Sequence, residues 1–273
     1  MKRTGIFFLY LIGERLNDFP EELEGILNRD NVYFYEAFYE LKPTPEELLL
    51  QVHSPRMIEG VKQTPYYETA LYSTGGTVQA GESIWRGEID NAFVFTGTGD
   101  HHAGRDYFGG GCHFNGAALA IASLREKFGA RRFAILDTDS HHGDGTRDIF
   151  KDDRDVLHIC LCSQNYDNGT NVDIAIPYHV TDEEYLARLE TEFTPRIAEF
   201  KPEIIFWEFG YDATSGDYGS KGLSPDCHPR IASIVKRAAD DVCRGRMVAI
   251  LCGGSRRDIA RYCIPRIINC LAE

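Results

Sequence analysis

The sequence has no long apolar run, and its cysteines form no regular framework. No stretch of the 273 residues approaches the ~20 consecutive apolar residues that a transmembrane helix needs, which argues against a membrane protein. The eight cysteines include no Cys-x-x-Cys pair, so neither a disulfide scaffold nor a zinc ribbon is indicated. Most are expected to be small core residues. Cys160 and Cys162 alternate along an expected strand, where core packing is favoured over binding of a soft metal.

Positive charge is also scarce. Lysine and arginine number 29 against 42 acidic residues, for a formal net charge of −13. This balance argues against a nucleic-acid partner, because phosphate binding depends on clustered basic side chains. It mildly favours cationic substrates.

The first residues imitate a short signal peptide, with Lys2 and Arg3 ahead of an apolar run over residues 5–13. However, Glu14 and Arg15 follow at once, and no small-residue cleavage site appears. A buried first strand is the favoured interpretation, and a cytoplasmic protein is expected.

Internal repeats, low-complexity tracts and linkers are absent, so a single domain over residues 1–273 is expected. Apolar, β-branched runs alternate with longer amphipathic segments, which predicts an α/β protein whose parallel sheet carries helices on both faces. Expected strands are 5–12, 92–96, 132–136, 156–161, 173–176, 204–209 and 247–251. One helix is expected to begin near residue 46. Further helices are expected over 68–84, 115–128, 181–200, 228–243 and 257–271.

Ligands of open parallel sheets bind beyond the carboxyl ends of the strands, so the residues that follow each strand are the candidates for a site. After the strand 132–136, alternation places Asp137, Asp139 and His141 on one face. Three ionisable groups at the end of an apolar strand are costly to bury without a cation. Asp139 and His141 offer the oxygen and nitrogen ligands that suit zinc.

Three further strand ends complete the predicted site. Asp212 directly follows the strand 204–209 and supplies a third ligand, which leaves a fourth position open as in catalytic zinc sites. His101 and His102 follow the strand 92–96 and are candidate general acids and bases, with Asp137 and Asp144 to orient them. A Gly-Gly-Ser-Arg-Arg segment follows the last strand.

The remaining histidines receive no role, and His158 is expected to be a hydrogen-bonded core residue.

Together these motifs resemble the histone deacetylase and acetylpolyamine amidohydrolase family. The similarity rests on four motifs in order: His-His-Ala-Gly at 101–104, Gly-Gly-Gly-Cys-His-Phe-Asn at 109–115, Asp-x-Asp-x-His-His-Gly-Asp-Gly at 137–145 and Gly-Tyr-Asp at 210–212. The resemblance implies a three-layer α/β/α fold of the arginase–deacetylase type, with a mostly parallel sheet of about eight strands. It also implies zinc-dependent hydrolysis of an N-acyl amide, most simply an acetyl amide, to a carboxylate and a free amine.

The resemblance assigns a role to each site residue. Zinc is held by Asp139, His141 and Asp212. His102, oriented by Asp144, acts as general base and then protonates the leaving amine. His101, oriented by Asp137, is mainly electrostatic. A structural K⁺ is a further implication, bound by Asp137, Asp139 and His141 groups near Cys160 and Leu161 of the next strand. Fe²⁺ is the alternative to zinc, since this ligand set accepts either ion.

Two departures from the family pattern shape the prediction. The family has Gly-Gly-Gly-Tyr after the last strand, and that tyrosine hydrogen-bonds the oxyanion. Arg256 lies nearest its place here and is the candidate oxyanion donor, with Ser255 or Tyr218 as alternatives. The other interpretation is that Arg256 and Arg257 point to solvent or pair with surface acids. Gly111 also stands where the family often has an aromatic wall residue, so Gly110 and Gly111 are expected to bound a wider substrate pocket, which Phe108 or Tyr166 refills.

The substrate is therefore an acylated amine, either a small molecule or an acyl-lysine. The first alternative is a hydrolase of an acidic acylated molecule, with Arg256 and Arg257 clamping its carboxylate bidentately. The second is a metal-binding protein without turnover, which the presence of both histidines and both orienting aspartates disfavours. The sequence leaves open whether the chain forms a homo-oligomer.

Overall fold

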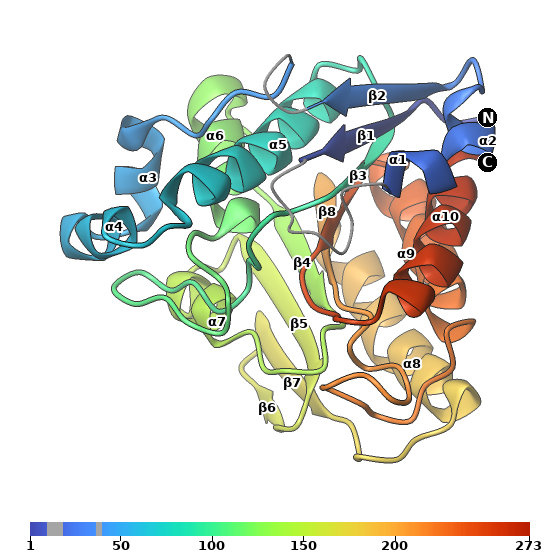
Figure 1. Ribbon diagram of the computed structural model, residues 1–273. Helices are drawn as coiled ribbons and strands as arrows, with labels where there is room; N and C mark the ends of the chain where they lie inside the picture. Colours follow the sequence, from blue (N-terminus) through green and yellow to red (C-terminus); the bar gives the residue numbers. More distant parts are fainter. Residues whose placement is uncertain (10–18, 37–39) are drawn as a thin grey trace.

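The structure, a computed structural model, describes residues 1–9, 19–36 and 40–273. Its centre is a nine-stranded sheet in the order β2-β1-β3-β9-β8-β4-β5-β7-β6, in which every pairing is parallel except the last (Figure 1). The strands are β1 Thr4–Phe8, β2 Val32–Glu36, β3 Asn91–Val94, β4 Phe133–Asp137, β5 Val156–Cys162, β6 Tyr166–Asp167, β7 Asn171–Ala175, β8 Ile204–Phe209 and β9 Met247–Leu251.

Helices cover both faces of this sheet, which confirms the predicted three-layer α/β/α architecture (Figure 1). One layer contains α3 to α6, and the opposite layer contains α8, α9 and α10. The described helices are α1 Phe19–Glu22, α2 Glu24–Leu27, α3 Glu46–Val52, α4 Pro55–Lys62, α5 Tyr67–Trp85, α6 Gly116–Phe128, α7 Asp144–Phe150, α8 Asp182–Phe200, α9 Cys227–Cys243 and α10 Arg257–Ala272. Among these residues, no helix combines the length and the apolarity that would let it span a bilayer.

The central strands are buried on both faces, and their side chains divide between two cores. Phe93 of β3 packs in the core under α8–α10, whereas its neighbours Ala92 and Val94 pack in the core under α3–α6. A strand whose alternate residues enter two apolar layers reads as a continuous hydrophobic run. This is why the strands are recognisable in the sequence.

The strand predictions agree with the structure to within a few residues, and part of one lies outside the described residues. β1 ends at Phe8, and positions 10–12 of the predicted first strand fall in the segment that the structure does not describe. The sequence prediction missed β2 and β6, and with them α1, α2, α4 and α7. These elements have only two to eight residues each, too few for a periodic pattern to stand out.

Parallel pairing brings the carboxyl ends of β3, β9, β8, β4 and β5 to one edge of the sheet. Asp137, the last residue of β4, lies beside Glu208 of β8 and Cys160 of β5 in register. The segments that follow these strands therefore meet at one place, where the predicted site residues lie.

Candidate active site

Three side chains from two strand ends converge in a candidate metal centre. The Nδ1 atom of His141 lies 3.0 Å from Oδ1 of Asp139 and 3.0 Å from Oδ2 of Asp212. Both carboxylates are buried, whereas the imidazole is half-exposed. Asp139 and His141 belong to the segment between β4 and α7, and Asp212 follows β8.

This centre attracts positive charge strongly. Hydrogen bonds from His141 to Asp139 and Asp212, together with the charges of these carboxylates, raise the pKa of His141 to about 10. Two carboxylates and one imidazole nitrogen form a common ligand set for zinc, and one face remains available to a water or a substrate. The residues present therefore fit a catalytic divalent metal.

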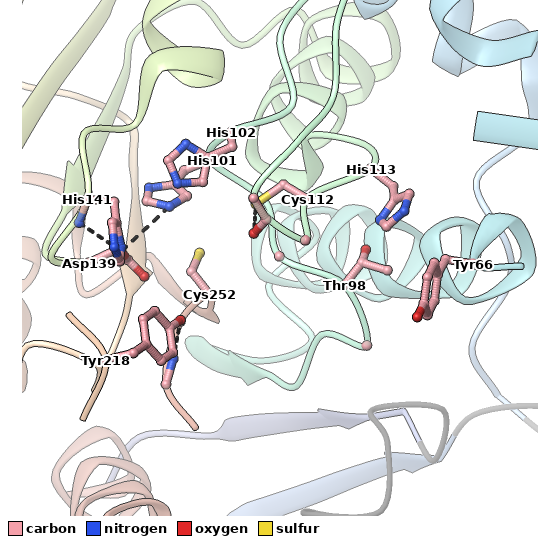
Figure 2. A pocket seen from close by; sticks show the side chains of 16 residues that line it. Tyr66, Thr98, His101, His102, Cys112, His113, Asp139, His141, Tyr218 and Cys252 are labelled. Carbon is pink, nitrogen blue, oxygen red and sulfur yellow. Dashed lines mark hydrogen bonds and ion pairs between the residues drawn. The ribbon is translucent and has the colours of Figure 1, made fainter. Parts of the chain in front are cut away.

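Each of the paired histidines lies against the aspartate that the sequence assigned to it. Nδ1 of His101 lies 2.8 Å from Oδ2 of Asp137, and Nδ1 of His102 lies 2.5 Å from Oδ1 of Asp144. Because the carboxylates accept the Nδ1 protons, the Nε2 atoms are left for chemistry. The ring centroids of the two histidines are 4.1 Å apart, and both rings line the same pocket as His141 (Figure 2).

The two histidines nevertheless have different surroundings. His101 is almost fully buried, and its Nε2 lies 3.6 Å from Oδ1 of Asp139. Burial opposes a charge on His101, but the carboxylates of Asp137 and Asp139 outweigh that effect and hold its pKa well above the usual value. The His102 side chain is more accessible, with 21% of its surface exposed. An imidazolium at His101 suits an electrostatic role, and the more accessible His102 suits proton transfer.

The sequence matches the model of a known protein family and is similar to several curated proteins. The histone deacetylase domain model matches residues 14–271. The chain belongs to the histone deacetylase family. A probable deacetylase of Archaeoglobus fulgidus is 29% identical, over 92% of this chain and 81% of its own length. Histone deacetylase HDA1 of Saccharomyces cerevisiae is also 29% identical, but the chain spans only 36% of that protein.

A bacterial relative and a solved structure extend the comparison. The histone deacetylase-like amidohydrolase of Pseudomonas aeruginosa is 27% identical, over 83% of this chain and 68% of its own length. The crystal structure of the HDA15 HD domain superposes with a TM-score of 0.85, covering 100% of this chain and 90% of that domain at 22% identity. This superposition shows that the arginase–deacetylase fold of the histone deacetylase family is shared.

Within this family site, the structure does not bring Arg256 into the pocket. Its guanidinium pairs with Asp258, through an Nε–Oδ1 hydrogen bond of 3.0 Å and a shorter bond from Nη2, and the side chain is 44% exposed. Neither Arg256 nor Arg257 lines the pocket. Arg256 stands at the N-cap of α10, so its side chain pairs with an acid of the first helical turn rather than with the metal centre.

Tyr218, and not the arginine, lines the pocket beside Asp139 and His141 (Figure 2). Its ring stacks on His141 with centroids 5.6 Å apart, and its hydroxyl accepts a hydrogen bond of 3.0 Å from the amide of Gly254. Partial desolvation and the carboxylates of Asp212 and Asp139 raise the pKa of Tyr218, so the phenol stays protonated. Its own O–H is then available as a donor.

The pocket beside the metal centre has a volume of about 480 Å³, within the range of small-molecule sites. Gly110 and Gly111 line it, as expected. A side chain at Gly110, whose φ is +58°, would lie 2.5 Å from the His102 ring, so glycine lets this loop close on the histidine. Phe108 and Tyr166 do not line the pocket; Tyr66 and His113 form that wall instead, with ring centroids 5.1 Å apart.

Three buried polar residues that support the histidines escaped the sequence prediction: Asp100, Glu208 and His53. Asp100 accepts hydrogen bonds from the amides of Gly116 and Ala117 and so fixes the start of the histidine loop to the first turn of α6. Glu208 interrupts the otherwise apolar strand β8, a signal that could have drawn attention to it. Burial, with Asp137 and Asp100 nearby, raises the pKa of Glu208 well above its usual value.

His53 joins the histidine loop to α6. Its Nδ1–H donates to the carbonyl of Gly104 at 2.8 Å, and its Nε2 accepts from the amide of Asn115 at 3.1 Å. Only the neutral imidazole makes both bonds, and burial lowers the pKa of His53 to about 4. The unfolded chain, with a histidine pKa of about 6.5, binds the proton first as the pH falls.

We expect His53 to make the fold acid-sensitive. Its contribution is complete above pH 6.5 and falls by about 2–3 kcal/mol as the pH approaches 4.5. Urea unfolding of the wild type and of His53→Gln at pH 7 and pH 4.5, both in the presence of a chelator, measures this. At pH 7 the wild type should have the larger unfolding free energy, and most of this difference from His53→Gln should disappear at pH 4.5. A difference that does not change with pH would contradict the assignment.

Proposed function

We propose that the protein is a zinc-dependent hydrolase that cleaves an N-acyl amide, most simply an acetyl amide, to a carboxylate and a free amine. The observation that carries the proposal is the convergence of Asp139, His141 and Asp212 beside two histidines that each have their own aspartate. A metal-binding protein without turnover has no need of those two histidine–aspartate pairs. Membership of the histone deacetylase family supports the same chemistry.

The contacts support a division of roles among these residues. When bound, zinc would polarise the acyl oxygen and lower the pKa of its bound water towards ~7. His102, held by Asp144, takes the proton of the attacking water at Nε2 and delivers it to the leaving amine. His101, held by Asp137, supplies positive charge beside the reacting atoms. Tyr218 donates its O–H to the oxygen that becomes negatively charged.

The substrate is an acylated amine of modest size or an acylated lysine at the end of a chain. No lysine or arginine is among the described residues that line the pocket, so the alternative of a clamped acidic substrate gains no support. The net charge of −13 favours substrates that carry a positive charge away from the amide. A monovalent cation near Asp137 and the His141 carbonyl, and Fe²⁺ in place of zinc, remain part of the proposal.

The direct test is a panel of substrates with the purified, zinc-loaded protein. Acetyl-lysine peptides, acetylated diamines and an acylated amino acid with a free carboxylate are compared, with the amine and the carboxylate both quantified. We expect equimolar products from at least one cationic or neutral substrate, loss of activity in a chelator, and recovery with zinc. If the zinc-loaded protein cleaves no amide in the panel, the proposed activity is wrong.

Tyr218→Phe separates the tyrosine from the arginine as oxyanion donor. The substitution keeps the ring that stacks on His141 and removes only the hydroxyl, so we expect kcat to fall ~10²–10³-fold with little change in KM. Arg256→Ala serves as the matched control and should retain kcat, because the guanidinium pairs with Asp258 outside the pocket. The assignment fails if Tyr218→Phe retains full kcat, or if Arg256→Ala shows the larger loss.

A further inference from the structure

A second cluster of metal-ligating side chains lies behind the candidate active site, on one face of β5. Alternation along β5 points Leu157, Ile159 and Leu161 into the core under α8–α10. His158, Cys160 and Cys162 therefore occupy the opposite face. All three are buried, and His158, against expectation, has no hydrogen-bond partner for either ring nitrogen among the described residues. This face of β5 therefore carries side chains that can bind a metal, whereas the other face is apolar.

Two residues from other segments join the cysteines. Asp173 of β7 is the register partner of Cys160, and His142 lies in the segment between β4 and α7. The Nδ1 atom of His142 is 3.5 Å from Sγ of Cys162 and 3.5 Å from Oδ1 of Asp173. Donor atoms from all four residues lie within 4.8 Å of one another. Two sulfurs, one imidazole nitrogen and one carboxylate oxygen therefore surround a single point.

We propose that His142, Cys160, Cys162 and Asp173 form a second metal site, which takes a thiophilic divalent ion such as zinc. Bonds of about 2.3 Å to sulfur and 2.0–2.1 Å to nitrogen or oxygen in a tetrahedron place neighbouring donor atoms about 3.3–3.8 Å apart. The two separations that His142 makes, each 3.5 Å, already have this length. Two thiolates also select zinc over the hard cations that carboxylates and carbonyls prefer.

The charges around this cluster balance once an ion is bound. Arg147 of α7 pairs with Asp173 through its Nη2 atom. Two thiolates and one carboxylate carry three negative charges, which a divalent ion and one guanidinium neutralise. Two buried thiolates without the ion would instead stand beside Asp137, whose Oδ2 lies 3.8 Å from the Cys160 sulfur. Metal binding and thiol deprotonation are therefore expected to occur together.

A disulfide and simple core packing both fit the cysteine pair less well than a metal does. Residues i and i+2 of one strand are separated by about 6.6–6.8 Å along the chain, at the upper limit of the Cα spacing of a disulfide. Core packing of Cys160 and Cys162, which the sequence favoured, does not account for the presence of His142 and Asp173 beside them. These two residues come from elsewhere in the sequence, so the cluster becomes visible only in the folded chain.

An ion in this site would tie the 139–144 segment to the sheet. His142 follows the catalytic ligand His141 directly, and the two cysteines belong to β5. The His142 side chain is 17% exposed and lines a surface pocket, which gives an ion a route of entry. The site is therefore expected to stabilise the fold, by restraining the segment that carries the first metal centre.

Cobalt substitution of the whole chain tests the proposal. The ligand set of the candidate catalytic centre, Asp139, His141 and Asp212, contains no sulfur, so a thiolate-to-Co²⁺ charge-transfer band in the near ultraviolet that depends on Cys162 reports on the second site. The metal-free wild type should bind two equivalents of Co²⁺ and develop this band. Cys162→Ser should lose the band and one equivalent. Asp139→Ala should lose one equivalent but keep the band, and Cys270→Ser, a half-buried cysteine of α10, should keep both.

The wild-type spectrum is decisive even if the serine variant fails to fold. One equivalent of Co²⁺ with no charge-transfer band would overturn the proposal, as would a band that Cys162→Ser retains. These outcomes are independent of amide hydrolysis. A protein without the band that still cleaves amides would remove the second site and leave the proposed function intact.

Discussion

Asp212→Asn is expected to lose one bound divalent ion per chain and, with it, all measurable amide hydrolysis. Asp212 is one of three side chains that meet at the centre, and its two oxygens already serve His141 and the segment at Ser140. The amide keeps the shape of the carboxylate but removes its charge, so an ion there would face a single carboxylate. Asp139→Ala should have the same effect. Elemental analysis beside single-turnover assays measures both consequences.

The matched control for this experiment is Asp258→Ala. Asp258 is an exposed carboxylate in the first turn of α10, and it contacts only Arg256 among the site candidates. It should retain metal and activity. We also expect excess zinc to raise the unfolding free energy of the wild type, by about 2.7 kcal/mol at a hundredfold excess over Kd, and to raise it less in Asp212→Asn. Unchanged metal content in both Asp139→Ala and Asp212→Asn would show that the ligands are wrongly assigned.

His102→Ala is expected to lower kcat ~10²–10⁴-fold while the metal content stays at the wild-type value. The imidazole has its Nδ1 proton engaged by Asp144 and lines the pocket with its other nitrogen, so no other residue in the described part of the chain is as well placed to carry the proton. His101→Ala should cost less, because His101 lies against Asp137 and Asp139 and its proposed role is electrostatic. Stopped-time assays with saturating substrate measure both variants.

Asp144→Asn tests whether this histidine acts through its partner. The asparagine has no negative charge to hold His102 as the carboxylate does, so kcat should fall while KM changes little. If His102→Ala retains a rate within a few-fold of the wild type, His102 has no place in proton transfer. If His101→Ala proves the more damaging substitution, the roles of the two histidines are reversed.

Much of the fold and of the grouping of the candidate metal centre could be predicted, because buried parallel strands and the polar residues at their ends leave local signals. Strands β8 and β9 were predicted with their observed bounds, since every residue of each strand is buried and nearly all are apolar. Asp139, His141 and Asp212 were predictable because each follows such a strand. Short elements such as β6, with two residues, leave no comparable pattern.

The errors concern side-chain contacts that sequence order does not reveal, most of them between distant segments. Arg256 aligned with the missing tyrosine in sequence, but the guanidinium pairs with Asp258 two residues away. Tyr218 reaches the pocket from another loop, so sequence order favoured the arginine and packing favoured the tyrosine. The grouping of His142 and Asp173 with the cysteines was hidden because it requires three separate segments, the one after β4, β5 and β7, to be brought together.

The bond from Gly254 to Tyr218 bears on how the site is organised before substrate arrives. Asp212 and Tyr218 lie six residues apart in one loop, and the backbone after β9 braces that loop at two points: Gly254 bonds to the Tyr218 hydroxyl, and the amide of Ser255 bonds to Asp217. Neither bond requires a metal ion. The phenol is therefore preorganised in the metal-free protein, and the entropy of placing it is lost once, during folding, instead of in every catalytic cycle.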